Sequence, residues 1–211
     1  MLHEDAVYKR NYQPMTIFSI GHSNRSIQAF IKLLQQHNIE ILIDVRSSPY
    51  SRYVPHFNST ALASAIEQAD IKYLFMGKDL GGRPERDEFY DENDHVLYNR
   101  VAESAYFLRG IQRLKEIGRA SRAAIMCSEE DPAVCHRHLL IGCVLAQQGV
   151  NLVHIRGNGR LQSEKQLASH GEKVSYGQSL WNEEMSNQEE NTWKSIRPVS
   201  RRKQPQSSLE L

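Results

Sequence analysis

The sequence predicts an α/β protein with a mainly parallel, five-stranded sheet in a single three-layer (α/β/α), Rossmann-like domain. Five apolar runs of strand length alternate along the chain with segments that carry apolar residues at helical spacing. The runs are almost continuously apolar, which is typical of strands buried on both faces of a parallel sheet. A glycine, a charge or a reactive side chain follows each run. The five runs are residues 16–20, 39–43, 71–76, 123–126 and 151–155.

Two short helices are expected to connect the first three strands. Ser26 can cap the first helix through its hydroxyl, and apolar residues recur at helical spacing over residues 27–34. Asn58 or Ser59 can cap the second, whose apolar residues lie within residues 62–69. Crossovers between parallel strands are right-handed, so the carboxyl ends of all the strands are expected at one edge of the sheet.

Two further helices are expected before and after the fourth strand. The first is long and carries apolar residues at helical spacing over residues 105–117. The second opens at Asp131-Pro132, because aspartate can cap a helix and proline suits its first position. It is predicted to continue to about Gly149, which places Cys135 in its first turn.

Residues 16–170 are expected to form the domain, between an N-terminal extension of residues 1–15 and a polar tail of residues 171–211. The tail is poor in residues that build a core, so we expect it to be largely disordered. Two connections within the domain, residues 47–58 and 78–100, are too long to be simple turns. Loops of this length are usually functional or disordered.

The composition predicts a cytoplasmic protein. The chain is 40% hydrophobic and 24% charged, and its net charge of +1 gives no global field for non-specific nucleic-acid binding. No segment approaches the ~18 apolar residues of a membrane span, and the first residues lack the pattern of a secretory signal. Three cysteines fit reduced thiols better than a disulfide framework. Any preference for anions must therefore come from local clusters.

Several arginines are expected at the edge of the sheet where the strands end. Guanidinium groups gathered there favour a planar or multiply charged anion such as a phosphate. The pair Gly81-Gly82 would let backbone N–H groups approach the same ligand. The alternative is that the arginines pair with nearby carboxylates and only hold the loops together. The arginines are Arg46, Arg52, Arg83, Arg137 and Arg160.

Cys127 and Cys135 have three competing interpretations. One of them could be a nucleophile or contact a ligand, with Glu129 or His22 as the proton-transfer partner. Together with His136 they could hold a metal, although their spacing lacks the paired C-x-x-C motif of structural zinc sites. They could also be buried structural thiols. We favour a site role for at least one of them, and we assign no metal and no cofactor.

His22 and Asp44 complete the candidate catalytic groups. His22 lies at the first strand–helix turn, where packing gives no reason for an imidazole. Asp44 could be a general base, a ribose ligand or the ion-pair partner of Arg46, and the ion pair is slightly favoured. Aromatic residues beside Arg52 suit stacking on a base, and they suit anchoring of the loop equally well. They are Tyr50, Tyr53, His56 and Phe57.

Several ordered motifs carry a resemblance to a known family. They are residues 16–23, 44–52, 57–58, 73, 80–84, 127–132 and 135–137, with residues 154–155 in the last strand. With these motifs the chain resembles the domain-of-unknown-function family number 488 over residues 16–159. The resemblance implies an α/β domain and a shared polar site, and it carries over no established reaction. The site residues that match the motifs are His22, Asp44, Arg46, Arg52, Gly81, Gly82, Arg83, Cys127, Glu129, Cys135, His136 and Arg137.

The predicted function is that of a small enzyme that binds an anionic small molecule or nucleic acid and hydrolyses a glycosidic or phosphate ester bond. The alternative is a non-catalytic module that binds a nucleotide or nucleic acid. A carboxylate and a histidine in an arginine-walled pocket would favour the enzyme, and neutralised arginines would favour binding only. The catalytic candidates are His22, Asp44, Cys127 and Glu129. The ligand-binding candidates are Arg46, Arg52, Gly81, Gly82, Arg83, Cys135, His136 and Arg137.

Overall fold

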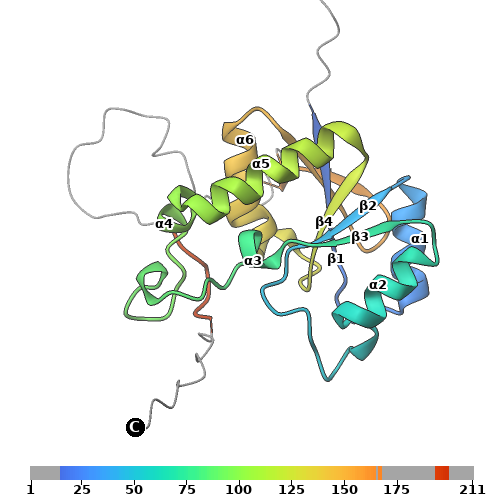
Figure 1. Cartoon of the computed structure of the whole chain (residues 1–211), viewed down its shortest axis with the longest axis horizontal. Coiled ribbons are helices and arrows are strands. Elements are labelled where there is room, and N and C mark those ends of the chain that lie inside the picture. Colours follow the sequence, from blue (N-terminus) through green and yellow to red (C-terminus); the bar gives the residue numbers. More distant parts are fainter. Residues whose placement is uncertain (1–14, 165, 168–192, 200–211) are drawn as a thin grey trace, which may run out of the picture.

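The computed structural model describes residues 15–164, 166–167 and 193–199, and within them the chain forms a six-stranded sheet (Figure 1). The strand order is β3-β2-β4-β1-β5-β6; the first five strands pair in parallel, and β6 is antiparallel to β5. The mainly parallel α/β fold is confirmed, and the five predicted strands belong to one sheet. The strands are β1 (Thr16–Gly21), β2 (Ile41–Asp44), β3 (Lys72–Phe75), β4 (Ala123–Cys127), β5 (Asn151–Ile155) and β6 (Leu161–Ser163).

The sequence predicts no strand corresponding to β6. This strand has only three residues and no apolar run, so its composition gives no signal. A tight turn precedes it, in which Gly159 has a φ of +82° and its N–H donates to the Arg156 carbonyl. The turn brings the chain back antiparallel to β5 at the edge of the sheet.

The three helices predicted between the first and fourth strands are present. Ser26 Oγ accepts a hydrogen bond from Ala29 N at the start of the first of them. Asn58 precedes the second, but its side chain accepts from Ser51 N within the loop and does not cap the helix. The helices are α1 (Ile27–Gln36), α2 (Ser59–Glu67) and α5 (Ala105–Ala120).

The two long connections contain short helical segments. In the first connection η1 (Pro55–Phe57) brings Phe57 into the core. The second contains three segments, and buried residues from each of them anchor the connection to the domain. They are α3 (Gly77–Leu80), η2 (Asp87–Phe89) and α4 (Tyr98–Glu103).

The predicted continuous helix after β4 is wrong in its first half. The chain forms η3 (Pro132–Val134), a π-helix η4 (Arg137–Gly142) and then α6 (Cys143–Gln147). Cys135 lies between the first two in an extended conformation, with φ −117° and ψ 143°. Its carbonyl accepts from the amides of residues 138 and 139, so the helix starts after Cys135 and not before it. Cys135 therefore does not lie in the first turn of a helix but directly before it.

Alternate residues of each central strand enter separate cores on the two faces of the sheet. On one face, buried residues such as Phe18 and Leu42 pack with residues of α1 and α2. On the other face, residues such as Ile43 and Ile125 pack with residues of α4, α5, η4 and α6. This placement is visible in Figure 1, where α1 and α2 lie apart from α5 and α6. The near-continuous apolar composition of the strands follows from this burial on both faces.

The connectivity creates a crevice between the carboxyl ends of β2 and β4. These strands are neighbours in the sheet, but the chain leaves them in opposite directions, from β2 outward to β3 and from β4 across β1 to β5. Open α/β sheets bind ligands at such a point, because the two connections separate and leave a space. The residues after β2 and β4 are those with the most reactive side chains in the sequence.

Residues 193–199 pack against the domain, which the prediction of a disordered tail did not anticipate. Trp193 Nε1 donates to the Leu139 carbonyl at 2.8 Å, and the Trp193 carbonyl accepts from Tyr98 N. Lys194 forms a β-bridge with Leu97. The N-terminal extension and the rest of the predicted tail lie outside the described residues. No helix in the described part of the chain has both the length and the apolar character needed to cross a membrane.

We expect Gly149→Ala to destabilise the protein by about 1–2 kcal/mol, because the residue has a φ of +70°, in the left-handed region. No heavy atom lies within 4 Å of the position of the new Cβ, so the effect comes from the backbone and not from a clash. Gly149→Asn is the control, because asparagine adopts this conformation more readily. Urea denaturation measures both changes, and an equal loss in the two variants would contradict the explanation.

Candidate functional site

A cleft of about 560 Å³ opens at the carboxyl ends of β2 and β4. Its lining comes from the residues after these strands, from the two long connections and from residues 195–199. Seven of the predicted site residues line it, and five do not. The seven are Arg46, Gly82, Arg83, Cys127, Glu129, Cys135 and His136. The other five are His22, Asp44, Arg52, Gly81 and Arg137.

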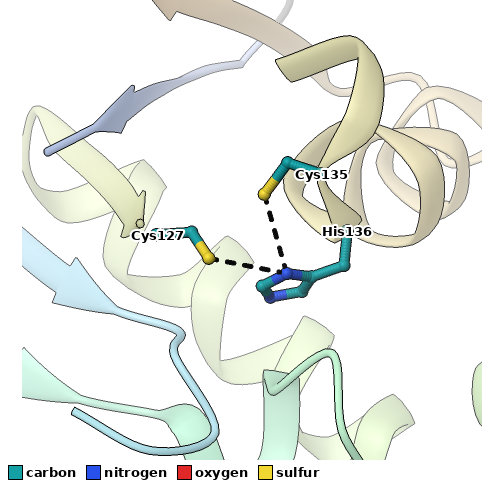
Figure 2. A group of neighbouring side chains, drawn as sticks. All are labelled: Cys127, Cys135 and His136. Atoms are coloured by element: carbon teal, nitrogen blue, oxygen red, sulfur yellow. Dashed lines mark hydrogen bonds between the residues drawn. The ribbon is translucent and has the colours of Figure 1, made fainter. Parts of the chain in front are cut away.

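Cys127, Glu129, Cys135 and His136 form a compact group, here named the thiol cluster. The two Sγ atoms each lie 3.7 Å from Nδ1 of His136, as Figure 2 shows for the two cysteines and the histidine. Both thiols also donate to Oε2 of Glu129, at 3.0 Å from Cys127 and 3.2 Å from Cys135. The cysteines and the histidine are buried, whereas Glu129 is exposed and lines the cleft.

The imidazole of His136 is held in one orientation. Its Nε2–H donates to the Val45 carbonyl at 3.2 Å, so the lone pair of Nδ1 faces the two sulfurs. Gly82 packs against the same ring, because a Cβ at this position would lie 2.7 Å from Cγ of His136. A Cβ at Gly81 would lie 2.4 Å from Ser47 Oγ. The glycine pair therefore allows close packing within the protein, and Gly81 lines a neighbouring cavity of about 350 Å³ that it shares with Arg83.

Arg137 lies beneath the cleft, and its prediction as a ligand contact is wrong. The side chain is 1% exposed. Nε donates to Cys135 Sγ at 3.4 Å, Nη1 donates to Ser19 Oγ at 2.7 Å, and Nη2 donates to the Glu129 carbonyl at 2.5 Å. The guanidinium thus holds the thiol cluster from below and places a positive charge beside Cys135.

The pKa values of the two thiols are shifted in opposite directions. The hydrogen bond with Cys135 and then burial raise the pKa of Cys127 well above its ordinary value. Burial works to raise the pKa of Cys135 as well, but the hydrogen bond from Cys127 and the charge of Arg137 outweigh it and lower that pKa. Cys135 is therefore the more acidic thiol of the pair.

A match to a known family covers the part of the chain that carries the thiol cluster. A family model described as domain of unknown function DUF488 matches residues 26–144, more than half of the chain. The chain belongs to the DUF488 family. No curated protein and no solved structure is similar enough to give a match. The matched region includes the whole thiol cluster together with Arg46 and Arg83, while residues 195–199 lie outside it.

His22 and Asp44 of this DUF488 protein belong to a structural network on the other side of Arg46. Arg46 donates to both carboxylate oxygens of Asp44, at 2.9 and 2.6 Å, and to Nε2 of His22 at 3.2 Å. Tyr73 Oη donates to the same carboxylate at 2.8 Å. Asp44 therefore forms the ion pair that the sequence slightly favoured, and its prediction as a catalytic base is corrected.

Both ring nitrogens of His22 also form hydrogen bonds within the protein. Its Nδ1–H donates to the Ser23 carbonyl at 2.7 Å, which leaves Nε2 as the acceptor for Arg46. The ring stacks on Phe57, with centroids 4.2 Å apart. Burial lowers its pKa to about 4, and the hydrogen bond to Ser23 only partly opposes this. His22 thus has no free lone pair with which to accept a proton from a substrate, so its catalytic assignment is corrected.

Arg52 and Arg160 lie outside the cleft. Arg52 is exposed, with its guanidinium 4.9 Å above the ring of Tyr53 and a hydrogen bond to that hydroxyl. Arg160 lines a separate cavity of about 450 Å³, where Arg156 pairs with Glu130 at 2.8 Å. The prediction that all the rim arginines converge on one ligand is therefore wrong for these two.

Arg83 and Arg197 are the exposed cations of the cleft. Within the described ranges neither guanidinium has a carboxylate within ion-pair distance. Sequence reasoning missed Arg197, because residue 197 follows a long polar stretch and no pattern connects it with a strand end. Glu129 is the acidic residue that lines the cleft over the described parts of the chain, so the local charge is positive.

A second polar cluster, which the sequence did not predict, lies behind the first. Glu164 pairs with His138 at 2.6 Å and with His154 at 3.0 Å. His154 Nδ1 lies 2.9 Å from Ser19 Oγ, the hydroxyl that accepts from Arg137. This chain of hydrogen bonds runs from the underside of the thiol cluster through His154 of β5 to Glu164, directly after β6. The sequence contains one signal for this cluster, the imidazole of His154 within the apolar strand β5.

We expect the free energy of unfolding to fall as pH decreases from about 6.5 to about 4, because His22 binds its proton only near pH 4 in the folded state. The unfolded chain binds that proton near the ordinary value of 6.5, so acid favours the unfolded state in this window. The contribution of His22 is roughly 3 kcal/mol, and above pH 6.5 it is constant. Urea denaturation of wild type and His22→Gln across this range isolates the effect. An identical pH dependence of the two proteins would contradict it.

In metal-free, reduced protein we expect Cys135 to react with iodoacetamide faster than Cys143. The thiolate is the reactive form, and burial raises the pKa of Cys143 to about 12, whereas that of Cys135 is lowered. Time-resolved labelling with peptide mass spectrometry measures both rates in the same sample. Equal or slower labelling of Cys135 would contradict the expectation that its thiol is the more reactive one.

Proposed function

We propose that this DUF488 protein is an enzyme that binds a phosphate-bearing substrate in the cleft and hydrolyses a glycosidic or phosphate ester bond. The observation that carries the proposal is the charge of the cleft. Arg83 and Arg197 are exposed in the cleft and form no ion pair with the described residues, and Glu129, the two thiols and the imidazole of His136 line the same cleft. Guanidinium groups bind phosphate through two parallel hydrogen bonds.

A nucleotide suits the cleft better than a long nucleic acid. The volume of about 560 Å³ is in the range of small-molecule sites. The ring of Tyr50 lines the cleft and is 73% exposed, which supports stacking on a base. The net charge of +1 provides no extended basic surface for a polymer.

Glu129 is the group best placed for proton transfer. Its Oε2 is occupied by the two thiols, while Oε1 has no hydrogen-bond partner among the described residues. In the proposed reaction Oε1 accepts a proton from water as the water oxygen bonds to phosphorus or to the anomeric carbon. The bond to the leaving group breaks with its electron pair, and that group takes up the proton that Glu129 releases.

The first test is a thermal-shift screen with nucleotides, sugar phosphates and short oligonucleotides. A nucleotide at a hundredfold excess over its Kd is expected to raise Tm by about 5–10 °C. Arg83→Lys is expected to weaken binding about tenfold, because lysine keeps the charge but loses the planar fork. Arg52→Lys is the matched control outside the cleft and should shift like wild type. The anion-binding proposal is wrong if no anion shifts wild type or if both variants behave alike.

The second test separates catalysis from binding. With the nucleotide that gives the largest shift, Glu129→Gln is expected to keep the Tm shift and to lose about 100- to 10,000-fold in the rate of hydrolysis. Release of phosphate or of free base is measured by chromatography. Binding by wild type without turnover would instead support the non-catalytic module, as would equal turnover in Glu129→Gln and wild type at background rates.

A further inference from the structure

Three buried donor atoms converge at the floor of the cleft. They are Sγ of Cys127, Sγ of Cys135 and Nδ1 of His136, and all three lie within 4.8 Å of one another (Figure 2). The exposed fractions of the three residues are 6%, 2% and 8%. Two thiolates and one imidazole form a donor set typical of zinc. Both cysteines are free of disulfide bonds, so both sulfurs are available as ligands.

The spacing of the donors agrees with tetrahedral coordination. With Zn–S of about 2.3 Å and Zn–N of about 2.05 Å, a sulfur and a nitrogen on one tetrahedral ion are about 3.6 Å apart. Both sulfurs lie 3.7 Å from Nδ1. The two sulfur–nitrogen separations are therefore already close to those that a bound ion requires, and the two sulfurs lie within 4.8 Å of each other.

The surroundings orient the donors toward a common point. His136 donates its Nε2–H to the Val45 carbonyl, and metal-binding histidines are usually oriented in this way through the nitrogen that does not bind the metal. Arg137 donates to the sulfur of Cys135, which stabilises a thiolate there. Gly82 leaves space for the imidazole, since a side chain at that position would displace it.

We propose that Cys127, Cys135 and His136 bind a zinc ion whose fourth ligand position faces the cleft beside Glu129. The Glu129 carboxylate lies 3.0 and 3.2 Å from the two sulfurs and is exposed to solvent, so this position is open to the carboxylate or to water. Three protein ligands and one open position are the arrangement of catalytic zinc sites. Use of the ion to activate water rests on the proposed function, whereas the binding of zinc does not.

The usual sequence rule for zinc sites, two cysteines in a C-x-x-C motif, does not detect this group, because a longer segment separates Cys127 from Cys135. The short helix η3 and the extended Cys135 carry the chain back to the end of β4. Cys135 and His136 then supply two ligands from adjacent positions, just before η4 begins. The paired C-x-x-C spacing of structural zinc sites is thus replaced by a loop that returns to the strand.

The competing metal position is the cluster of His138, His154 and Glu164, whose donor atoms also lie within 4.8 Å of one another. Its carboxylate already accepts hydrogen bonds from both imidazoles, at 2.6 and 3.0 Å. These three side chains satisfy one another without an ion, and the cluster has no thiolate. The thiol cluster is therefore the stronger zinc site.

The experiment is a zinc titration of reduced full-length protein after removal of metals with EDTA. A chromophoric chelator of known zinc affinity competes for the ion and reports binding. Wild type is compared with Cys127→Ser and Cys135→Ser, and Cys143→Ser is the matched control because this thiol lies outside the cluster. Wild type and Cys143→Ser are expected to bind zinc in a one-to-one ratio. Loss of a residue that only supports a metal ligand lowers metal affinity about 10–100-fold. Loss of a ligand itself is expected to lower zinc affinity by more than this.

Cobalt binding to wild type provides a readout that does not depend on the folding of a variant. The cobalt form is expected to show a thiolate-to-metal charge-transfer absorption, in wild type and in Cys143→Ser alike. The proposal is overturned if wild type binds no zinc, if the cobalt form shows no thiolate band, or if Cys127→Ser retains wild-type affinity. Equal loss in Cys143→Ser would overturn it as well. Because these measurements contain no nucleotide, they can fail while the proposed hydrolysis stands, and the reverse is also possible.

Discussion

The buried guanidinium of Arg137 is the interaction on which the rest of the cleft floor depends. A charge enclosed by protein is strongly unfavourable unless its donors are satisfied. Its three nitrogens bond to β1, to the loop after β4 and to the sulfur of Cys135, which fixes three segments relative to one another. The carbonyl of Glu129 can accept from Arg137 only because Gly21 has no side chain, since a Cβ there would lie 1.8 Å from that oxygen. One glycine and one arginine thus determine the position of the loop that carries Glu129.

The four arginines beside and beneath the cleft divide into two kinds that the sequence does not distinguish. Arg46 and Arg137 are 5% and 1% exposed and hold the ends of strands together through carboxylate, carbonyl and hydroxyl groups. Arg83 and Arg197 are exposed in the cleft. The first kind makes the floor rigid, and the second kind gives the cleft its positive charge. A rigid floor matters for any reaction, because catalytic groups must be held in position before the substrate arrives.

Much of the fold could be predicted because buried parallel strands leave a clear apolar signal, and the side chains at their ends could be predicted to lie at one edge. The direction of those side chains could not. Asp44 follows Leu42 and Ile43 and faces the same side of the sheet as Leu42, with Tyr73 and Phe57, whereas Cys127 faces the opposite side with Ile125. This one-residue alternation separates the predicted catalytic groups into a structural network and a cleft.

Two other features could not be predicted from local sequence patterns, because they depend on contacts between residues far apart in the chain. The break in the predicted helix at Cys135 accompanies its contacts with Glu129 and Arg137, and helical propensity contains no such information. Arg197 reaches the cleft because Trp193 and Ser195 pack against the domain. Neither a strand end nor a periodic pattern marks this segment.

The wall formed by residues 195–199 lies outside the region shared by the family, while the floor lies within it. A chain that kept residues 26–144 and lacked the later segment would retain the thiol cluster and would leave it under a more open cleft. Arg83 and Tyr50 also lie within the shared region, so the later segment adds one further cation, Arg197, to a cleft whose other charged groups the family match already covers.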